Sequence, residues 1–372
     1  MKASRQDVSP SLPKVPIARL VGHDGPIQQV QFAANGKYCL TGGHDRTVRL
    51  WNPLRIDPAF PPPPALPPLP SGTATTPSSY TSMDSLARSL PIQSYANGHT
   101  HPISALALDS SSTTLVAGSN KTVVITDIVT QQVKRRFQGH TGRINAVAIS
   151  HGCDTYLSAS YDGTVRIWDG RSHNSYEPIM TLTEAKDSVT DIHVVQDDEM
   201  ESSSHKKKRN NQNTTALIRT ASVDGVVRTY DIRKGSLAAD DCGSAITGMT
   251  PTYDGQCLAL NCLDGAIRLM ELESGELLNT YTGSHVAGQY GLQCAMTADD
   301  ATLVTGSEDG TAVLYDIVRG TTVQTLQGHT RATCSIATHP QRECSSVVIT
   351  ASYDGTAVVW ANHEGFMKWQ DG

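Results

Sequence analysis

The sequence lacks the features that mark a membrane or a secreted protein. No run reaches the ~18 consecutive apolar residues that a membrane-spanning helix needs. The first residues, Met-Lys-Ala-Ser-Arg-Gln-Asp, are polar and contain no apolar core of a signal peptide. The net charge is −6, so there is no general excess of positive charge for nucleic-acid binding. We therefore expect no membrane contact, and contact with nucleic acid only indirectly, within a larger complex.

The eight cysteines also lack a metal-binding or disulfide pattern. There is no CxxC motif, the spacing is irregular, and several cysteines fall within expected strands. We expect reduced thiols in a protein of the cytoplasm and nucleus. No residue cluster indicates a metal ion, a cofactor or a small-molecule substrate.

What the sequence does contain is a repeated unit, clearest at residues 157–171. There, Asp162-Gly163 predicts a tight turn between a strand of small residues and a strand rich in β-branched and aromatic residues. An Asp or Asn at this turn is followed six residues later by Trp, Tyr, Met or Thr in seven places. The seven pairs are Asp45/Trp51, Asn120/Thr126, Asp162/Trp168, Asp224/Tyr230, Asp264/Met270, Asp309/Tyr315 and Asp354/Trp360.

The spacing of these units identifies the fold. A Gly-His pair precedes the turn by 21 to 25 residues in four copies, and in a fifth copy, at His285, a Ser separates the two. Turn-to-turn spacings are 75, 42, 62, 40, 45 and 45 residues, and four of them match the ~40–45 residues of a WD-repeat blade. We therefore predict an all-β fold, a seven-bladed WD-repeat β-propeller over residues 16–361.

The unit boundaries predict how the ring closes. Repeat seven ends near Trp360 without an outer strand, so residues 16–21 are expected to supply it and to remove the exposed sheet edge. Residues 1–15 are then expected to form a flexible tail, and residues 362–372 a C-terminal tail.

The two long spacings predict insertions at residues 56–91, which are rich in Pro, Ser and Thr, and at 197–214, which are charged. Within the first, residues 60–70 resemble segments that bind domains with aromatic grooves, of the EVH1 type; a solvated linker is the alternative. Within the second, the basic run 206–209 fits a nuclear localisation signal or a contact with an acidic partner, and equally a solubilising loop.

Three repeats contain a complete set of four polar residues that can form a buried hydrogen-bonded chain. The sets are His23, Thr41, Asp45, Trp51; His140, Ser158, Asp162, Trp168; and His329, Thr350, Asp354, Trp360. A buried Asp needs partners, so we expect each His to donate to its Asp. These sets resemble catalytic triads, but a catalytic site does not repeat around a ring, and we interpret them as structural.

Candidate partner contacts lie where the propeller presents its turns around the channel. The residue before each turn Asp, together with residues just after the Gly-His pairs, is expected to face the channel mouth. Tyr and Arg are frequent hot-spot residues at interfaces. The candidates are His44, Arg143, Tyr161, Glu308, Arg331 and Tyr353; the alternative is that they are ordinary turn residues.

A second pattern follows two of the repeats. Trp168-Asp169-Gly170-Arg171 and Tyr230-Asp231-Ile232-Arg233 resemble the W/Y-D-x-R motif by which WD-repeat substrate receptors dock on the cullin-4 adaptor. Arg171 and Arg233 would then supply the ionic contact, because Arg offers a rigid bidentate fork.

Several longer segments resemble the family of the mitogen-activated protein kinase organiser, a WD-repeat scaffold. They include residues 38–55 with Asn52-Pro-Leu-Arg55, and residues 183–189, 222–228, 230–235, 254–257 and 273–278. The resemblance spans blades one to six, and the two insertions depart from it.

The resemblance implies a non-catalytic scaffold that assembles MAP-kinase modules, is associated with the spliceosome in pre-mRNA splicing, or both. The alternative is a substrate receptor of a cullin-4 ubiquitin ligase. An enzyme built on a propeller is the third possibility, and no unique acid–base pair in the sequence supports it.

Overall fold

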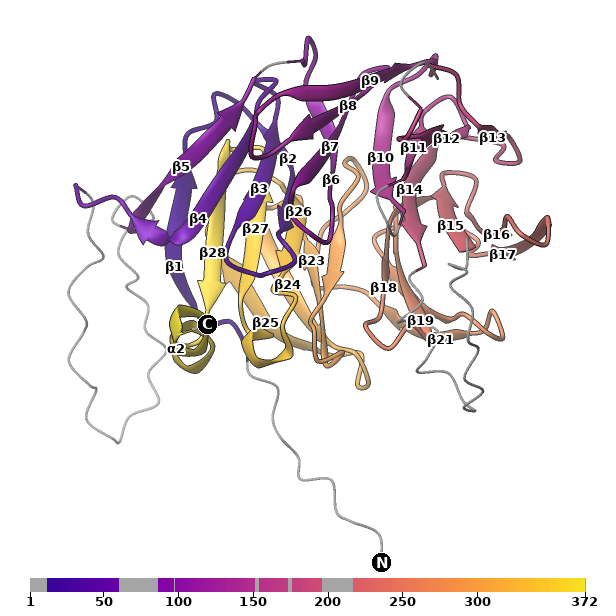
Figure 1. Ribbon diagram of the computed structural model, residues 1–372. Coiled ribbons are helices and arrows are strands. Elements are labelled where there is room, and N and C mark those ends of the chain that lie inside the picture. The colour runs from indigo at the N-terminus through magenta and orange to yellow at the C-terminus, as the bar shows by residue number, and fades with distance from the viewer. Residues whose placement is uncertain are drawn as a thin grey trace, which may run out of the picture.

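The computed structural model describes residues 12–59, 86–96, 98–150, 154–172, 176–195 and 217–371. In this part of the chain the strands form one eight-stranded sheet and five four-stranded sheets. The sheets stand side by side around a ring, and the first strands lie beside the last ones (Figure 1). The eight-stranded sheet holds blades one and seven, and each other sheet is one blade. The predicted seven-bladed β-propeller is therefore confirmed.

Each blade has strands a to d, counted outward from the channel. Blade one contains β2 (Ile27–Phe32), β3 (Cys39–Gly43), β4 (Val48–Ile56) and β5 (Arg88–Tyr95), and blade two contains β6 (Ile103–Leu108), β7 (Thr114–Ser119), β8 (Thr122–Asp127) and β9 (Val133–Gln138). Blade three contains β10 (Ile144–Ile149), β11 (Thr155–Ser160), β12 (Val165–Asp169) and β13 (Met180–Leu182), and blade four contains β14 (Val189–Val194), β15 (Leu217–Ser222), β16 (Val226–Asp231) and β17 (Ser236–Asp241). Blade five contains β18 (Ile246–Pro251), β19 (Cys257–Cys262), β20 (Ile267–Glu271) and β21 (Leu277–Tyr281), and blade six contains β22 (Cys294–Met296), β23 (Thr302–Gly306), β24 (Thr311–Asp316) and β25 (Thr322–Gln327). Blade seven contains β26 (Thr333–Thr338), β27 (Val348–Ser352), β28 (Thr356–Ala361) and β1 (Val15–Val21), with a short 3-10 helix (Arg342–Cys344) between β26 and β27.

A bulge near the start of the innermost strand recurs in six blades, and in several of them it links neighbouring blades. The hydroxyl of Thr190 lies 3.1 Å from the carbonyl of Ala221 in its own blade and 3.0 Å from that of Ile246 in the next. Thr247 spans blades five and six in the same way. Because a bulge re-aims its side chain, one small polar residue satisfies backbone acceptors of two sheets at once.

The N-terminal strand closes the ring as predicted. β1 pairs antiparallel with β28 from Val15 opposite Ala361 to Val21 opposite Thr356. It also pairs in parallel with β5, at Arg19 opposite Arg88 and Leu20 opposite Ser89. This second pairing joins blades one and seven into one continuous sheet, so neither β1 nor β5 leaves a free edge along that stretch.

The structure moves the boundaries of the first insertion. The expected span of 56–91 is too long, because β4 runs to Ile56 and β5 already begins at Arg88. Pro91 is accommodated within β5 because it lies opposite Trp51, where the register between the two strands shifts. Residues 60–70 and the whole second insertion at 197–214, including the basic run 206–209, lie outside the described residues.

The expected C-terminal tail at 362–372 is instead helix α2 (His363–Asp371), docked against the ring at its lower edge (Figure 1). Trp369 is 3% exposed, and its indole N–H donates to the carbonyl of Gly36 at 2.9 Å. Its ring packs edge-on against Phe32 and His339. At the other end of the chain, residues 1–11 lie outside the described residues, and Pro13 accepts a hydrogen bond from Gln324.

Candidate interaction surface at the channel mouth

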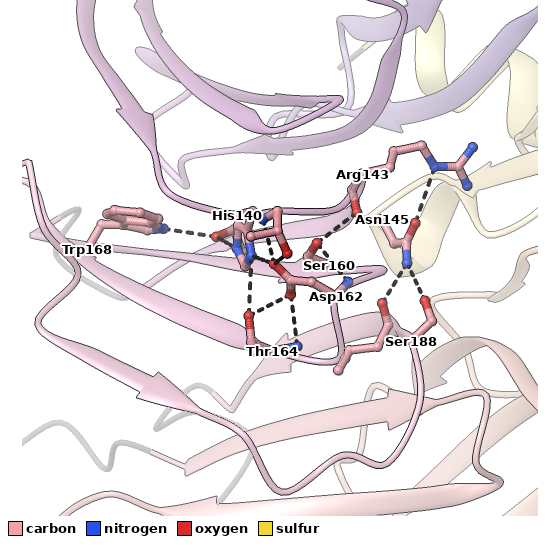
Figure 2. A network of polar contacts seen from close by, with 11 residues as sticks. His140, Arg143, Asn145, Ser160, Asp162, Thr164, Trp168 and Ser188 are labelled. Carbon is pink, nitrogen blue, oxygen red and sulfur yellow. Dashed lines mark hydrogen bonds and ion pairs between the residues drawn. The ribbon is translucent and has the colours of Figure 1, made fainter.

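All four members of each predicted polar set meet. In blade three, His140 donates through Nδ1 to Asp162 at 2.9 Å, and Ser158 bonds His140 Nε2 at 2.8 Å (Figure 2). Trp168 donates from Nε1 to Ser158 at 2.9 Å. The sets of blades one and seven have the same geometry, with His–Asp distances of 2.9 and 3.1 Å. Each hydroxyl accepts from the Trp and donates to the His, which fixes the imidazole tautomer.

The charge states fit a structural role. Burial opposes ionisation of Asp162, but hydrogen bonds from Thr164 and His140 hold the pKa of that carboxyl well below its usual range. Burial lowers the pKa of His140, so the ring is neutral at pH 7. Ser158 is fully buried beneath Trp168, so no substrate reaches its hydroxyl. The buried hydrogen-bonded arrangement therefore fits a structural role within the blade.

The remaining blades satisfy their turn carboxylates differently. In blade four, Arg228 donates to Asp224 at 2.7 Å, and both side chains are nearly buried. Blade five uses the more exposed pair Arg268–Asp264 at 2.6 Å. In blade six, the inserted Ser284 displaces His285, whose Nδ1 meets the hydroxyl of Tyr315 at 2.8 Å instead of the turn Asp.

Four of the predicted contact residues line one cavity at the channel mouth, of about 540 Å³. They are His44, Glu308, Arg331 and Tyr353, and the remaining lining residues are Pro26, Gln28, Tyr290 and Ala332. These side chains come from blades one, six and seven, which the closure of the ring brings together. A concave site with a few polar groups and aromatic walls is the usual form of a recognition site.

The wall of this cavity is fixed by two contacts. The carboxylate of Glu308 accepts hydrogen bonds from the backbone N–H groups of Gln289 and Tyr290, at 2.6 and 2.9 Å. Tyr290 packs edge-on against Tyr353, with 5.3 Å between the ring centres. Burial raises the pKa of Tyr353 to about 12, so its hydroxyl is protonated at neutral pH. Glu308 thus serves to position Tyr290.

A smaller cavity of about 300 Å³ adjoins the first and shares Gln28 and His44 with it. It is lined by the predicted residue Arg143 together with His101, Pro102, Ser104 and Asn120. Arg143 is exposed and lies 3.4 Å from the amide oxygen of Asn145, which in turn bonds Ser188 in blade four (Figure 2). The two cavities together form one surface across blades one, two, three, six and seven, which we call the mouth surface.

The other predicted residues line neither cavity. Tyr161 is 68% exposed and lies beside the mouth surface, because its backbone N–H donates to the carbonyl of Arg143 at 2.8 Å. Arg171 and Arg233 follow β12 and β16 in the turns between strands c and d, on the opposite face of the ring. Both backbone N–H groups donate to the Asp two residues earlier, and the side chain of Arg171 is 71% exposed.

Sequence reasoning missed Tyr290, Gln28 and His101. Tyr290 lies in an irregular loop between His285 and the short strand β22, where no repeat spacing predicts a position. The rule that selected Arg143 and Arg331, namely residues just after the Gly-His pair, would have found His101, which follows His99 by two residues. Gln28 is the bulge residue of β2, and a two-residue alternation does not predict a bulge.

Within the described residues, no group of three or more His, Cys, Asp or Glu side chains is placed to hold a metal ion. In the same part of the chain, no helix has the length and apolar character needed to cross a membrane.

Comparison with known proteins agrees with the repeat structure. The family described as "WD domain, G-beta repeat" matches residues 14–52, 90–127, 131–169, 275–316 and 320–361. The longest unmatched stretch, residues 170–274, contains blade four and most of blade five, where Arg replaces His as the partner of the turn Asp. The divergence is therefore local and does not interrupt the ring.

Individual relatives match along nearly the full length. The chain is similar to the WD repeat domain-containing protein 83 homolog of Dictyostelium discoideum, with 29% identity over 93% of this chain and 97% of that protein. It is similar to WD repeat domain-containing protein 83 of Rattus norvegicus, with 33% identity over 90% of both chains. The Homo sapiens protein of that name is 33% identical over 90% of this chain and 89% of its own length. The chain therefore belongs to the WD-repeat family, as a homologue of WD repeat domain-containing protein 83.

Proposed function

We propose that this protein is a non-catalytic interaction scaffold that holds a partner protein at the mouth surface. One observation carries the proposal: residues from three blades, distant in sequence, converge on a single cavity with two tyrosines and a cation. The residue sets that resemble catalytic triads are buried and hold blades together. The aromatic and arginine side chains at the mouth are the types that carry binding energy in protein interfaces.

The charges of the mouth surface favour an acidic partner segment. Arg143 and Arg331 are exposed there, and His44 and His101 lie beside them. Among the described residues, Glu308 is the one acidic residue that lines either cavity, and its carboxylate is engaged by backbone N–H groups. The protein as a whole has a net charge of −6, so this local excess of cations is a specific feature.

We infer that the partners belong to MAP-kinase modules, to the spliceosome, or to both, with the protein present in the cytoplasm and the nucleus. The support is the resemblance of residues 38–55 and 230–235 to the kinase-organiser family. A nuclear signal at 206–209 and a proline-rich ligand at 60–70 remain predictions from the sequence.

The test is affinity purification of the wild type and two charge-reversal variants from nuclear and cytosolic extracts, read by mass spectrometry. Arg331→Glu places a negative charge in the mouth cavity and is expected to lose the partners at least tenfold. Arg319→Glu is the matched control, because Arg319 is exposed in the turn between β24 and β25 on the opposite face. Equal capture by both variants would refute the site. Absence of kinase-module and splicing components from the wild-type sample would refute the named partners.

The cullin-4 alternative rests on a separate observation: Arg171 is 71% exposed two residues after the end of β12, and its side chain pairs with Asp169 at 3.5 Å. The double change Arg171→Ala and Arg233→Ala is expected to abolish capture of the cullin-4 adaptor and to leave mouth-surface partners unchanged. If the wild type does not capture the adaptor, this alternative fails.

A further inference from the structure

Two thiols meet in blade five, and one of them stands where blades one and three have the histidine of their set. The Sγ atoms of Cys242 and Cys262 are 3.7 Å apart. Cys242 stands 22 residues before the turn residue Asp264 (264 − 242), the spacing at which His23 and His140 precede Asp45 and Asp162. Cys262 stands two residues before Asp264, the position held by Ser160 and Ser352 in blades three and seven. In blade five a thiol therefore stands at the position of the histidine, and a second thiol stands at the position of a serine that lies outside the four-residue set.

The pair lies at the junction of blades four and five. Cys262 ends β19 and is 3% exposed, within an apolar cluster that includes Ala221 and Val227 of blade four. Cys242 is partly exposed in the loop from β17 to β18, and its backbone N–H donates to Gly225 of blade four at 2.8 Å. A small oxidant can therefore reach Cys242 from solvent, whereas Cys262 lies buried behind it.

The two thiols differ in acidity: the pKa of Cys242 is lowered and the pKa of Cys262 is raised. A hydrogen bond from Cys262 lowers the pKa of Cys242, and the Arg268 guanidinium adds to this, while burial opposes it. The same hydrogen bond, together with burial, raises the pKa of Cys262. Among the seven cysteines that the structure describes, Cys242 is the one whose pKa is lowered. Thiolate character and access select the reactive cysteine, so Cys242 attacks and Cys262 resolves.

We propose that Cys242 and Cys262 form a reversible redox modification site, which hydrogen peroxide oxidises to an intramolecular disulfide. The Cys242 thiolate attacks one peroxide oxygen, the O–O bond breaks, and the departing hydroxide takes a proton to become water. The Cys262 sulfur then attacks the sulfur of the Cys242 sulfenic acid. An S–S bond forms as the S–O bond breaks, and the hydroxide that leaves takes the Cys262 thiol proton as a second water. Two thiols supply the two electrons that reduce the peroxide, and a dithiol such as dithiothreitol reverses the reaction by exchange.

The disulfide would add a covalent cross-link to blade five, whose turn residue Asp264 is otherwise held by the ion pair with Arg268. It would tie the loop that enters the blade to the end of strand b, as the His–Asp bond does in blades one, three and seven. Because a covalent link between residues 242 and 262 removes conformations from the unfolded chain, the oxidised protein is expected to unfold at a higher temperature.

The first test maps the bond in the full-length wild type. The protein is treated with one equivalent of hydrogen peroxide, free thiols are blocked with N-ethylmaleimide, and the digest is read without reduction. The expected product links the peptides that carry Cys242 and Cys262, and dithiothreitol restores both thiols. Overoxidation of Cys242 to sulfinic acid without a Cys262 link would refute the proposal, as would preferential linkage to Cys257, the other partly buried thiol of blade five.

The second test compares unfolding midpoints before and after oxidation. The wild type is expected to gain several degrees, reversibly with dithiothreitol, and Cys242→Ser is expected to gain none. Cys257→Ser is the matched control and is expected to behave as the wild type. An equal gain in Cys242→Ser would overturn the assignment. The wild-type mapping needs no variant, so it decides the question even where a serine variant folds poorly.

Discussion

The turn aspartates differ in whether water could solvate their hydrogen-bond donors if the carboxylate were removed. The side chain of Asp162 is 9% exposed and accepts from His140, from Thr164 and from the backbone of Thr141. Asp309, at the equivalent turn of blade six, is exposed and accepts from the side chain and backbone of Thr311. Water can solvate the groups around Asp309 but not those around Asp162. Removal of the carboxylate is therefore expected to lower the free energy of unfolding more at Asp162 than at Asp309.

We predict that Asp162→Ala lowers the free energy of unfolding by about 3 kcal/mol, because it leaves buried donors without an acceptor. Asp309→Ala, the same change at an exposed turn, is expected to lower it by less than about 1 kcal/mol. Urea unfolding followed by tryptophan fluorescence measures both. Similar losses at the two positions would contradict the structural role of the buried set.

Residue spacing was sufficient to predict the three complete sets, because each blade repeats the same distances along the chain. It was insufficient for His285, since one inserted residue, Ser284, redirects that ring to Tyr315. It could not predict the Tyr290–Tyr353 contact either, because that contact joins an irregular loop of blade six to a turn of blade seven. Contacts within a repeat follow from the sequence period, and contacts between irregular loops do not.

At the scale of elements, β1 connects the two ends of the chain. Ala18 and Leu20 of this strand are fully buried, and the backbone N–H of Arg19 donates to the carbonyl of Ala87, directly before β5, at 2.8 Å. The lack of an outer strand in repeat seven was enough to predict the pairing with β28. The pairing with β5 was not predictable, because it depends on where the chain returns after the insertion.

We predict that deleting residues 1–21 lowers the unfolding midpoint of the whole ring by about 10 °C or more, since it exposes buried side chains and opens two sheet edges. Deleting residues 1–11 leaves β1 in place and is expected to change the midpoint little. Thermal unfolding by circular dichroism compares the two truncations. If the longer deletion melts at the wild-type temperature, β1 does not close the ring.

Helix α2 is the element that the sequence analysis overlooked. Its signals are short: Asn362 accepts the N–H of Gly365 at 2.6 Å as an N-cap, and Phe366 and Trp369 share one face three residues apart. Nine residues give too few turns for a clear period of 3.6, and the helix is stabilised by docking more than by propensity.

We predict that Trp369→Ala costs about 3–5 kcal/mol of stability or releases α2, because it removes a large buried ring and the bond to Gly36. Met367→Ala, at a position 46% exposed in the same helix, is expected to cost less than about 0.5 kcal/mol. Urea unfolding combined with hydrogen exchange of residues 363–371 distinguishes global loss from undocking. Unchanged stability and unchanged exchange protection in Trp369→Ala would show that the docked helix contributes nothing.

At the scale of the whole molecule, one buried and two half-buried histidines make stability depend on pH. Burial lowers the pKa of His99, His193 and His339 to about 4 each, and nearby Arg136 and Arg219 add to the effect at the first two. The unfolded chain titrates near the ordinary value of 6.5, so it binds more protons than the folded protein between these limits. The contribution of these rings is therefore complete above pH 6.5 and is lost as the pH falls to about 4.

Carboxylates affect the pH dependence in two ways, one within this pH range and one below it. Burial raises the pKa of Asp191 to about 6, so the folded protein holds a proton there and gains stability as the pH falls from 6 toward 3.8, against the trend of the histidines. Asp45, Asp162 and Asp354 have lowered pKa values, so their contribution is lost only as the pH falls below about 3.8. Between pH 6 and 4 the effect of three histidines on the free energy of unfolding exceeds the opposite effect of one aspartate. The free energy of unfolding therefore rises with pH in this range.

We predict that the free energy of unfolding decreases steadily from pH 6.5 to 4, and that His339→Asn reduces this slope by about 1.4 kcal/mol per pH unit near pH 5, the equivalent of one proton. Asn removes the titrating ring, and its amide oxygen can still accept the N–H of Gln341, which bonds His339 Nδ1 at 3.2 Å. The variant is expected to be less stable at every pH because Phe32 and Trp369 lose a packing partner, so the readout is the slope and not the absolute value. Urea titrations at intervals of half a pH unit give the slope directly.

Asp309→Ala is the control for a surface change and is expected to keep the wild-type slope above pH 4. A His339→Asn slope equal to that of the wild type would show that His339 titrates normally in the folded ring and does not contribute to acid unfolding.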